Sequence, residues 1–343
     1  MLDLQKTYFI ADIASNHNGS LSLAKDLIVE AAKAGADAAK FQHFHAATIA
    51  HRDDLNYYGD GTSHMADWRE KPYDVYLHHE IPIRWNPILA ETCHNNGISF
   101  ITTPYSLQLV DEVAHYVDAW KIGSGDITYH DLIDHIVAQD DYKHIILSTG
   151  ASTPDEVCAA SRRIPPKRLI LLQCNTNYTG DTRNNAYINL KWLNTLGWTT
   201  YGLSDHTMTD TTVLGAVALG AKVIEKHFTL QTQNRLIGPD QHFSIKPKPW
   251  KQMVNRVREL EASLGDGVKM IESNEVETRI LQRRAVRARN DIAKGCLVQE
   301  LDLVYLRPCP LGSLPPWADR EILGKELIHC KQAGETIVPE DVK

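Results

Sequence analysis

Apolar, strand-like segments alternate with amphipathic segments through the first 265 residues, and this alternation limits the possible folds more than any other feature of the chain. The strand-like segments cover residues 7–13, 36–42, 97–104, 118–125, 144–150, 169–175, 199–205 and 221–228. The segments between and after them favour helices, and several end in Gly or Asn-Gly: 21–36, 85–97, 107–116, 131–139, 153–164, 188–197, 210–221 and 248–265. Eight consecutive strand–helix units predict an α/β fold, the (β/α)8 or TIM barrel.

The pattern changes after the eighth helix, so we expect a second domain. Residues 1–265 form the predicted barrel domain, and the charged segment 266–284 resembles a linker. Residues 285–343 alternate short strand-like pieces with turns, which predicts a small β-rich domain. A domain of about 60 residues buries little surface by itself. We therefore expect it to pack on a barrel, either its own or that of a partner chain.

Composition excludes several classes of function. The net charge of −7, with no evident basic face, argues against a nucleic-acid-binding protein. No apolar run approaches the roughly 20 residues that span a bilayer. The chain enters its first strand almost at once, without a signal-like leader. Its six scattered cysteines include no Cys-x-x-Cys pair, which favours reduced thiols and a cytoplasmic location.

Polar residues collect at the carboxyl ends of the predicted strands, where this barrel type builds its active sites. In chain order they are Asp12, Lys40, Gln42, Thr103, Lys121, Ser124, Asp126, Ser148, Asn175, Ser204, His206, Glu225 and His227.

Two of these residues, His206 and His227, end consecutive strands and are therefore candidates for a pair of metal ligands. The alternative is that each is a hydrogen-bonded core or loop histidine. Equivalent positions on successive strand–helix units favour the metal site.

Lys40 and Lys121 lie in otherwise apolar strands, where an unpaired ammonium group is costly. They could extend toward solvent or pair with Asp12 or Asp126 for structural reasons. Alternatively, they could bind an anionic substrate together with the hydroxyl groups of neighbouring strand ends. Lysines, hydroxyls and backbone N–H groups suit a phosphate or a carboxylate. The hydroxyl donors are Thr103, Ser124, Ser148 and Ser204.

The segment 43–83 after the second strand is too long for an ordinary connection of this barrel. It is either a surface insertion or a lid or wall of the substrate site.

The chain also resembles a known family through motifs that follow one another in order. ADIASNHNGS, AKFQ, ITTPYS, WKIGSGD, ILSTG, GLSDHT, GAKVIEKHFT and GPDQHFS resemble the successive motifs of sialic acid synthases. This family is the NeuB-type N-acetylneuraminate synthases, which include legionaminate and pseudaminate synthases. The later motifs NDIAKG, ELDLVYLRP, GKEL and AGETIVPEDV resemble the family's C-terminal SAF, or antifreeze-like, domain.

The resemblance implies condensation of phosphoenolpyruvate with an open-chain N-acylated hexosamine such as N-acetylmannosamine, giving a nine-carbon 2-keto acid and phosphate. In the alternative within the family, the acceptor is a 6-deoxy-diacetamido hexose. It further implies a divalent metal, Mn²⁺ or Mg²⁺, on His206 and His227, no organic cofactor, and a homodimer. In that dimer Arg307 would reach the partner's barrel and bind the N-acyl group.

Residue by residue, the resemblance assigns three groups. The catalytic group is Asp12, Lys121, Asp126, His206 and His227. Phosphoenolpyruvate would contact Lys40, Thr103, Lys121, Ser124, Ser148 and Ser204. The sugar would face Gln42, Tyr178 and Asp240, and the remaining substrate-binding residues would be Asn175, Thr176 and Arg307.

The chain departs from the family pattern at a few positions. The family usually has Glu at the positions of Asp12 and Asp126, so both carboxylates are shorter here by one methylene. Thr176 stands where Asn is usual, with Asn175 and Asn177 on either side. The segment RPCPLGSLPP lacks the usual glycine pattern of the small domain.

Two functions outside the family remain as alternatives. Another metal-dependent barrel with a phosphate substrate, an aldolase or a sugar-phosphate isomerase, explains the lysines and histidines but leaves the appended β-rich domain without a role. A non-catalytic binding protein with a decayed site is disfavoured because Lys40, Lys121, His206 and His227 are all present.

Overall fold

The computed structural model describes residues 1–59, 65, 68, 70–178, 187–230 and 239–343. It divides into two compact units, Met1–Gly265 and Asp266–Lys343. Within the described residues, no helix is both long enough and apolar enough to cross a membrane.

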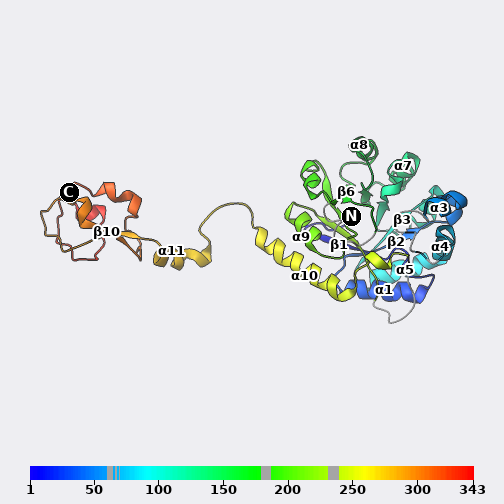
Figure 1. Cartoon of the computed structure of the whole chain (residues 1–343), viewed down its shortest axis with the longest axis horizontal. Coiled ribbons are helices and arrows are strands. Elements are labelled where there is room, and N and C mark those ends of the chain that lie inside the picture. Colours follow the sequence, from blue (N-terminus) through cyan, green and yellow to red (C-terminus); the bar gives the residue numbers. More distant parts are fainter. Residues whose placement is uncertain (60–64, 66–67, 69, 179–186, 231–238) are drawn as a thin grey trace. The chain divides into compact units, whose positions relative to one another are not determined.

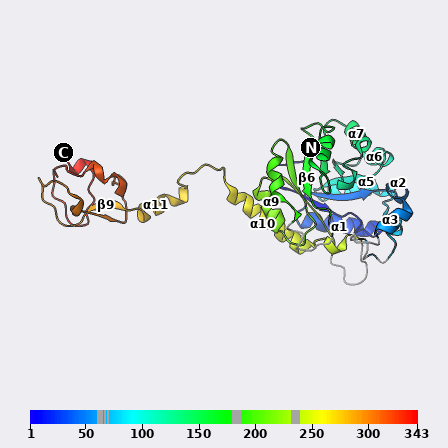
Figure 2. The same cartoon turned by 45° about the horizontal axis from the view of Figure 1, so that its top comes forward.

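The first unit is a closed barrel of eight parallel strands in chain order, which confirms the predicted barrel (Figures 1 and 2). The eighth strand pairs with the first, and Asp12 lies opposite His227 in the register that closes the barrel. The strands are β1 (Tyr8–Asp12), β2 (Ala38–His43), β3 (Ser99–Pro104), β4 (Ala119–Ile122), β5 (Ile145–Ser148), β6 (Leu169–Cys174), β7 (Thr200–Ser204) and β8 (Val223–His227).

Helices connect successive strands around the outside of the barrel (Figure 1). They are α1 (Leu21–Lys33), α5 (Asn86–Asn95), α6 (Leu107–Val113), α7 (His130–Ala138), α8 (Pro154–Ser161) and α9 (Thr211–Ala218), followed after β8 by α10 (Pro247–Leu264). Several begin at a hydroxyl cap; the Thr153 side chain, for example, accepts a hydrogen bond from the Glu156 N–H.

The helix predicted over 188–197 is present, but it is shorter than expected and is not an α-helix. That segment contains the 3₁₀ helix η5 (Leu190–Thr195). It starts after Asn189, whose backbone is left-handed with φ 53°, and is only six residues long. Such short turns commonly adopt the tighter 3₁₀ winding.

The alternation of side chains along each strand separates an inner core from an outer one. The inner core is apolar and consists of Tyr8, Ile10, Ala38, Ile101, Ala119, Ile146, Ile170, Leu172 and Val223. Two residues further along the same strand faces come Asp12, Lys40, Thr103, Lys121, Ser148, Cys174 and Glu225. The interior of the barrel therefore changes from an apolar plug to a polar layer at the carboxyl ends of its strands.

The inserted segment 43–83 is partly helical, with α2 (Ala46–Ile49), α3 (Arg52–Gly59) and α4 (Pro72–His79), followed by η2 (Ile83–Trp85). Its Phe44 is buried, and the Phe44 ring lies 5.4 Å from the Tyr76 ring of α4 and 6.1 Å from that of Tyr105 after β3. The described part of the insertion thus packs onto the neighbouring β3 connection.

The second unit has its own apolar core, made of Val286, Ala288, Ile292, Val298, Leu303, Leu314, Ala318, Ile322, Leu327 and Ile337. Its one two-stranded sheet pairs β9 (Ala285–Ala288) with β10 (Leu303–Leu306) in antiparallel fashion. Isolated bridges join the turns around it, together with η8 (Glu300–Asp302), η9 (Pro316–Glu321) and η10 (Pro339–Asp341). The segment 266–284, which we expected as a linker, contains η7 (Ser273–Glu275) and the helix α11 (Val276–Gln282).

Candidate active site

Four buried charges form the centre of the polar layer in the barrel. Lys40 Nζ lies 2.8 Å from Asp12 Oδ2 and 3.6 Å from Glu225 Oε2. Lys121 Nζ donates to Glu225 Oε1 at 3.1 Å, and Ser204 Oγ donates to the same oxygen at 2.9 Å. Each of the four side chains is at most 4% exposed. The two ammonium and two carboxylate groups therefore neutralise one another in a site that excludes water.

The pKa values of the two carboxyl groups in this cluster are shifted in opposite directions. Burial opposes ionisation of Glu225, but Lys121 and Lys40 outweigh it and lower the pKa of Glu225 to about 2. Burial dominates at Asp12, so its pKa is raised in spite of Lys40. Glu225 therefore stays ionised, whereas Asp12 is the carboxylate that takes up a proton more readily.

His206 and His227 lie side by side above these charges, with ring centroids 5.3 Å apart. Burial lowers the pKa of each histidine to about 3, so both imidazoles are neutral at physiological pH. His206 Nδ1 donates to the Asn175 carbonyl oxygen at 2.8 Å, which leaves the lone pair on Nε2. His227 Nε2 is 3.4 Å from Asp12 Oδ2.

Aromatic rings enclose the two histidines. The Tyr178 ring centroid is 4.2 Å from that of His206, and the Phe243 centroid is 4.8 Å from that of His227. This packing limits the rotation of both imidazoles and shields them from solvent.

Several buried polar atoms in this layer have no hydrogen-bond partner in the described protein. They are Thr103 Oγ1, Asp126 Oδ2, Ser148 Oγ, Glu225 Oε2 and His227 Nδ1. An unsatisfied buried polar group costs roughly 1–3 kcal/mol, so proteins seldom keep one without a use. Five such atoms around one interior indicate a site built for a polar ligand.

Two further carboxyl groups titrate near neutrality. Desolvation raises the pKa of Asp126 to about 6 and that of Asp240 to about 7. Asp240 Oδ2 also accepts a hydrogen bond from the Ser15 N–H at 2.9 Å. Both groups can therefore exchange protons at physiological pH.

The two histidines are suitable ligands for a divalent metal because both imidazoles are neutral. His227 Nδ1 has no protein partner, and His206 Nε2 keeps its lone pair. The described residues contain no group of three or more His, Cys, Asp or Glu side chains that could hold an ion. A metal on this pair would therefore need oxygen atoms from water or substrate to complete its coordination.

The structure brings most of the remaining predicted residues to the same end of the barrel. Ser124 Oγ accepts a hydrogen bond from the Gly150 N–H at 3.0 Å. Gln42, Asn175 and Thr176 are half-buried at or just beyond their strand ends. Arg307 belongs to the second unit, where it is exposed.

The sequence patterns did not identify every residue of this site. Glu225 was noted only as a strand end, and its place between two lysines requires the closed barrel. In VIEKH, Glu225 and His227 are two residues apart, and in a strand this spacing places both side chains on the same face. It is the one sequence signal that both point inward. Tyr76 of the insertion was also missed; burial, together with the nearby Asp240 and Asp126, raises its pKa to about 12.

The chain is similar to known proteins over most of its length. The family model "NeuB family" matches residues 27–269. N,N'-diacetyllegionaminic acid synthase of Legionella pneumophila is 32% identical, over 98% of this chain and 94% of the relative. Pseudaminic acid synthase of Campylobacter jejuni is 30% identical, over 99% and 97%. The crystal structure of N-acetylneuraminic acid synthetase from Leptospira borgpetersenii is 27% identical, with a TM-score of 0.68 over 80% of this chain and 90% of that one.

The buried cluster predicts a large cost for removing one charge. In Glu225→Gln both lysines lose their common counter-charge, and we expect the free energy of unfolding to fall by about 3 kcal/mol. Urea unfolding followed by circular dichroism measures it. Glu259→Gln on the exposed face of α10 is the control and should change stability by no more than ~0.5 kcal/mol. Equal stability of the two variants would contradict the prediction.

Proposed function

The chain belongs to the NeuB family of sugar acid synthases, and we propose that it joins phosphoenolpyruvate to the open-chain form of an N-acylated amino sugar. The products would be a nine-carbon 2-keto acid and phosphate. One observation carries the proposal: a buried layer that combines two lysines, two carboxylates, two neutral histidines and unpartnered hydroxyls. This reaction needs an anion site next to a group that activates an aldehyde.

We propose that Lys40 and Lys121 bind the carboxylate and phosphate groups of phosphoenolpyruvate. The unpartnered hydroxyls of Thr103 and Ser148 are available as donors, and Ser124 and Ser204 lie at neighbouring strand ends. Because the four buried charges already cancel, a strongly anionic ligand requires added positive charge. Protonation of Asp12, whose pKa is raised, supplies part of it.

We propose that a divalent metal on His206 and His227 supplies the rest and, when bound, polarises the sugar aldehyde. Imidazole ligands suit Mn²⁺ better than Mg²⁺, which prefers oxygen ligands. Mn²⁺ is therefore our preferred ion. No organic cofactor is needed for this chemistry.

The carboxyl groups with raised pKa values suit the proton transfers of the proposed reaction. C3 of phosphoenolpyruvate forms a bond to the aldehyde carbon, and the aldehyde oxygen takes a proton, for which protonated Asp240 is the proposed donor. Water then adds at C2, the bond from C2 to the phosphate oxygen breaks, and ionised Asp126 is the proposed acceptor of the proton from water. Gln42, Asn175, Thr176 and Tyr178 would contact the sugar.

For the acceptor, we propose a 6-deoxy-diacetamido hexose rather than N-acetylmannosamine. Relatives that are at least 30% identical over nearly the whole chain are named for legionaminic and pseudaminic acid, which supports this choice. N-acetylmannosamine remains the alternative acceptor.

We also propose that residues 285–343 are a SAF domain and that the working unit is a homodimer, in which the exposed Arg307 serves the acceptor site of the partner chain. A guanidinium group with its fixed fork of donors suits the carbonyl oxygen of an N-acyl group.

Phosphate release and product mass test the proposed function. With phosphoenolpyruvate and Mn²⁺, we expect the protein to release phosphate with a manno- or altro-configured 6-deoxy-diacetamido hexose at a kcat/KM at least ~10-fold above that for N-acetylmannosamine. Lys121→Met, which removes one cation of the proposed anion site, should lose this activity. No phosphate release with any of the three sugars would refute the proposal.

Metal dependence gives an independent test. Chelation should abolish turnover and Mn²⁺ should restore it. In His206→Ala, isothermal titration should show Mn²⁺ affinity reduced by ~10-fold or more, because one of two protein ligands is lost. His115→Ala, which alters an exposed histidine, is the control and should bind Mn²⁺ as the wild type does. Full turnover in excess chelator would exclude the metal.

The carboxyl groups predict a bell-shaped dependence of kcat/KM on pH. Activity should fall below about 6, where Asp126 becomes protonated, and above about 7, where Asp240 loses its proton. Asp240→Asn should lower kcat and remove the high-pH limb. Asp131→Asn, on the exposed surface of α7, should leave the profile unchanged. A high-pH limb that persists in Asp240→Asn would assign it to another group.

A further inference from the structure

We propose that a second buried ion pair, Lys226 with Asp205, is a positioning device that fixes His206 and His227; the inference rests on the metal site proposed above. Each member of the pair adjoins one of the two histidines in the sequence. Because side chains alternate along a strand, Ser204, His206, Glu225 and His227 face the interior while Asp205 and Lys226 face outward. The pair therefore lies behind the two histidines.

The ammonium group of Lys226 has three acceptors, one for each of its N–H donors. Its Nζ lies 2.5 Å from Asp205 Oδ2 and donates to the carbonyl oxygens of Thr207 at 2.6 Å and Thr209 at 3.4 Å. Neither charged side chain has any exposed surface. The ammonium group thus links β8 to the loop that leads from β7 into α9.

Asp205, at the start of the same loop, accepts hydrogen bonds from residues further along it. Its Oδ1 accepts from the Thr207 N–H at 3.0 Å, and its Oδ2 accepts from the Thr207 hydroxyl at 3.0 Å and the Thr212 hydroxyl at 2.7 Å. His206 stands between Asp205 and Thr207, so the backbone on both sides of the imidazole is fixed by this network.

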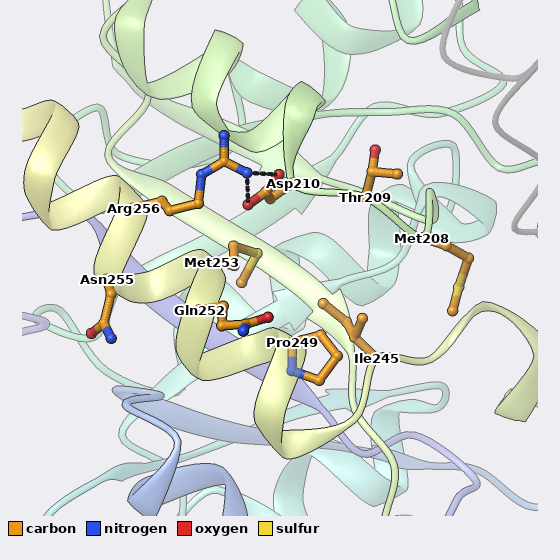
Figure 3. A pocket seen from close by; sticks show the side chains of 9 residues that line it. All are labelled: Met208, Thr209, Asp210, Ile245, Pro249, Gln252, Met253, Asn255 and Arg256. Atoms are coloured by element: carbon orange, nitrogen blue, oxygen red, sulfur yellow. Dashed lines mark hydrogen bonds and ion pairs between the residues drawn. The ribbon is translucent and has the colours of Figure 1, made fainter.

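On its outer side, by contrast, this loop is less well supported. A surface pocket of about 560 Å³ lies between this loop and α10. Figure 3 shows the side chains that line it, among them Met208, Thr209 and Asp210. Across it, Arg256 donates to both carboxylate oxygens of Asp210 at 2.7 Å. Apart from this half-exposed pair at its end, the loop is anchored mainly from the inside, by Lys226 and Asp205.

Stability alone is a weak explanation for this pair. The desolvation of two fully buried charges often exceeds their attraction, so apolar or neutral residues of similar volume are commonly as stable. What neutral residues cannot reproduce is a donor that binds two carbonyl oxygens and a carboxylate at one point. The geometry therefore points to placement of the histidines as the role of the pair.

The test uses the full-length chain with both charges removed, Asp205→Asn/Lys226→Met. Urea unfolding measures stability, isothermal titration measures Mn²⁺ affinity, and hydrogen–deuterium exchange reports on residues 205–212. We expect near-wild-type stability, Mn²⁺ affinity reduced by ~10-fold or more, and faster exchange confined to the loop. Wild-type Mn²⁺ affinity with unchanged exchange would overturn the proposal, and so would a variant that does not fold, because the pair would then serve stability.

A matched control lies at the opposite end of the barrel. Arg168 is buried just before β6, 3.3 Å from Asp140, and also donates to the carbonyl oxygens of Val137 and Lys143. Asp140→Asn/Arg168→Met should leave Mn²⁺ affinity within about twofold of the wild type, since it is far along the strands from the histidines. An equal loss of affinity in this control would refute a specific role for Lys226.

If the wild type itself binds no Mn²⁺, the metal part of the proposed function fails, and exchange in residues 205–212 still tests the pair. Unchanged exchange in Asp205→Asn/Lys226→Met would then overturn positioning independently.

Discussion

Closure of eight strands around a narrow interior is the constraint on which the rest of this structure depends. Each strand places every second side chain inside, and the inner core fills the lower part with small and branched residues. Above that plug the charged side chains are almost completely buried, so bulk water does not solvate them. Charges in that layer must be neutralised by one another, and the pairing of Lys40 and Lys121 with Asp12 and Glu225 follows from this requirement.

The same alternation explains how far the sequence alone could predict the site. A residue at a strand end is known to face inward once the strand and its phase are known, so Lys40, Lys121, His206 and His227 could be assigned to one interior. Which carboxylate meets which lysine depends on the stagger between strands. That is why pairing of Lys121 with Asp126 seemed possible, whereas Glu225 from the opposite side of the barrel is its actual partner.

Segments without such periodicity were predicted less well. The run 188–197 has helical spacing, but it is too short to show whether its turns are α or 3₁₀. The insertion 43–83 has no repeat that would assign Tyr76 to the side facing Asp126 and Asp240. In the second unit, the core consists of single residues from many turns, so its short pieces resemble strands in sequence although only two strands pair.

The two buried ion-pair systems differ in what surrounds them, and that difference separates binding from support. Around Lys40 and Lys121, several polar atoms lack partners, so the cluster is incomplete without a ligand. Around Lys226 and Asp205, every charged oxygen and the ammonium group have protein partners, so no ligand is needed. Side chains alternate along β8. Glu225 and His227 face the interior, where polar atoms lack hydrogen-bond partners, and Lys226 faces outward, where its hydrogen bonds are complete. The hydrogen bonds and ion pair on the outer face of β8 can therefore fix the strand, and with it the side chains that β8 contributes to the polar layer.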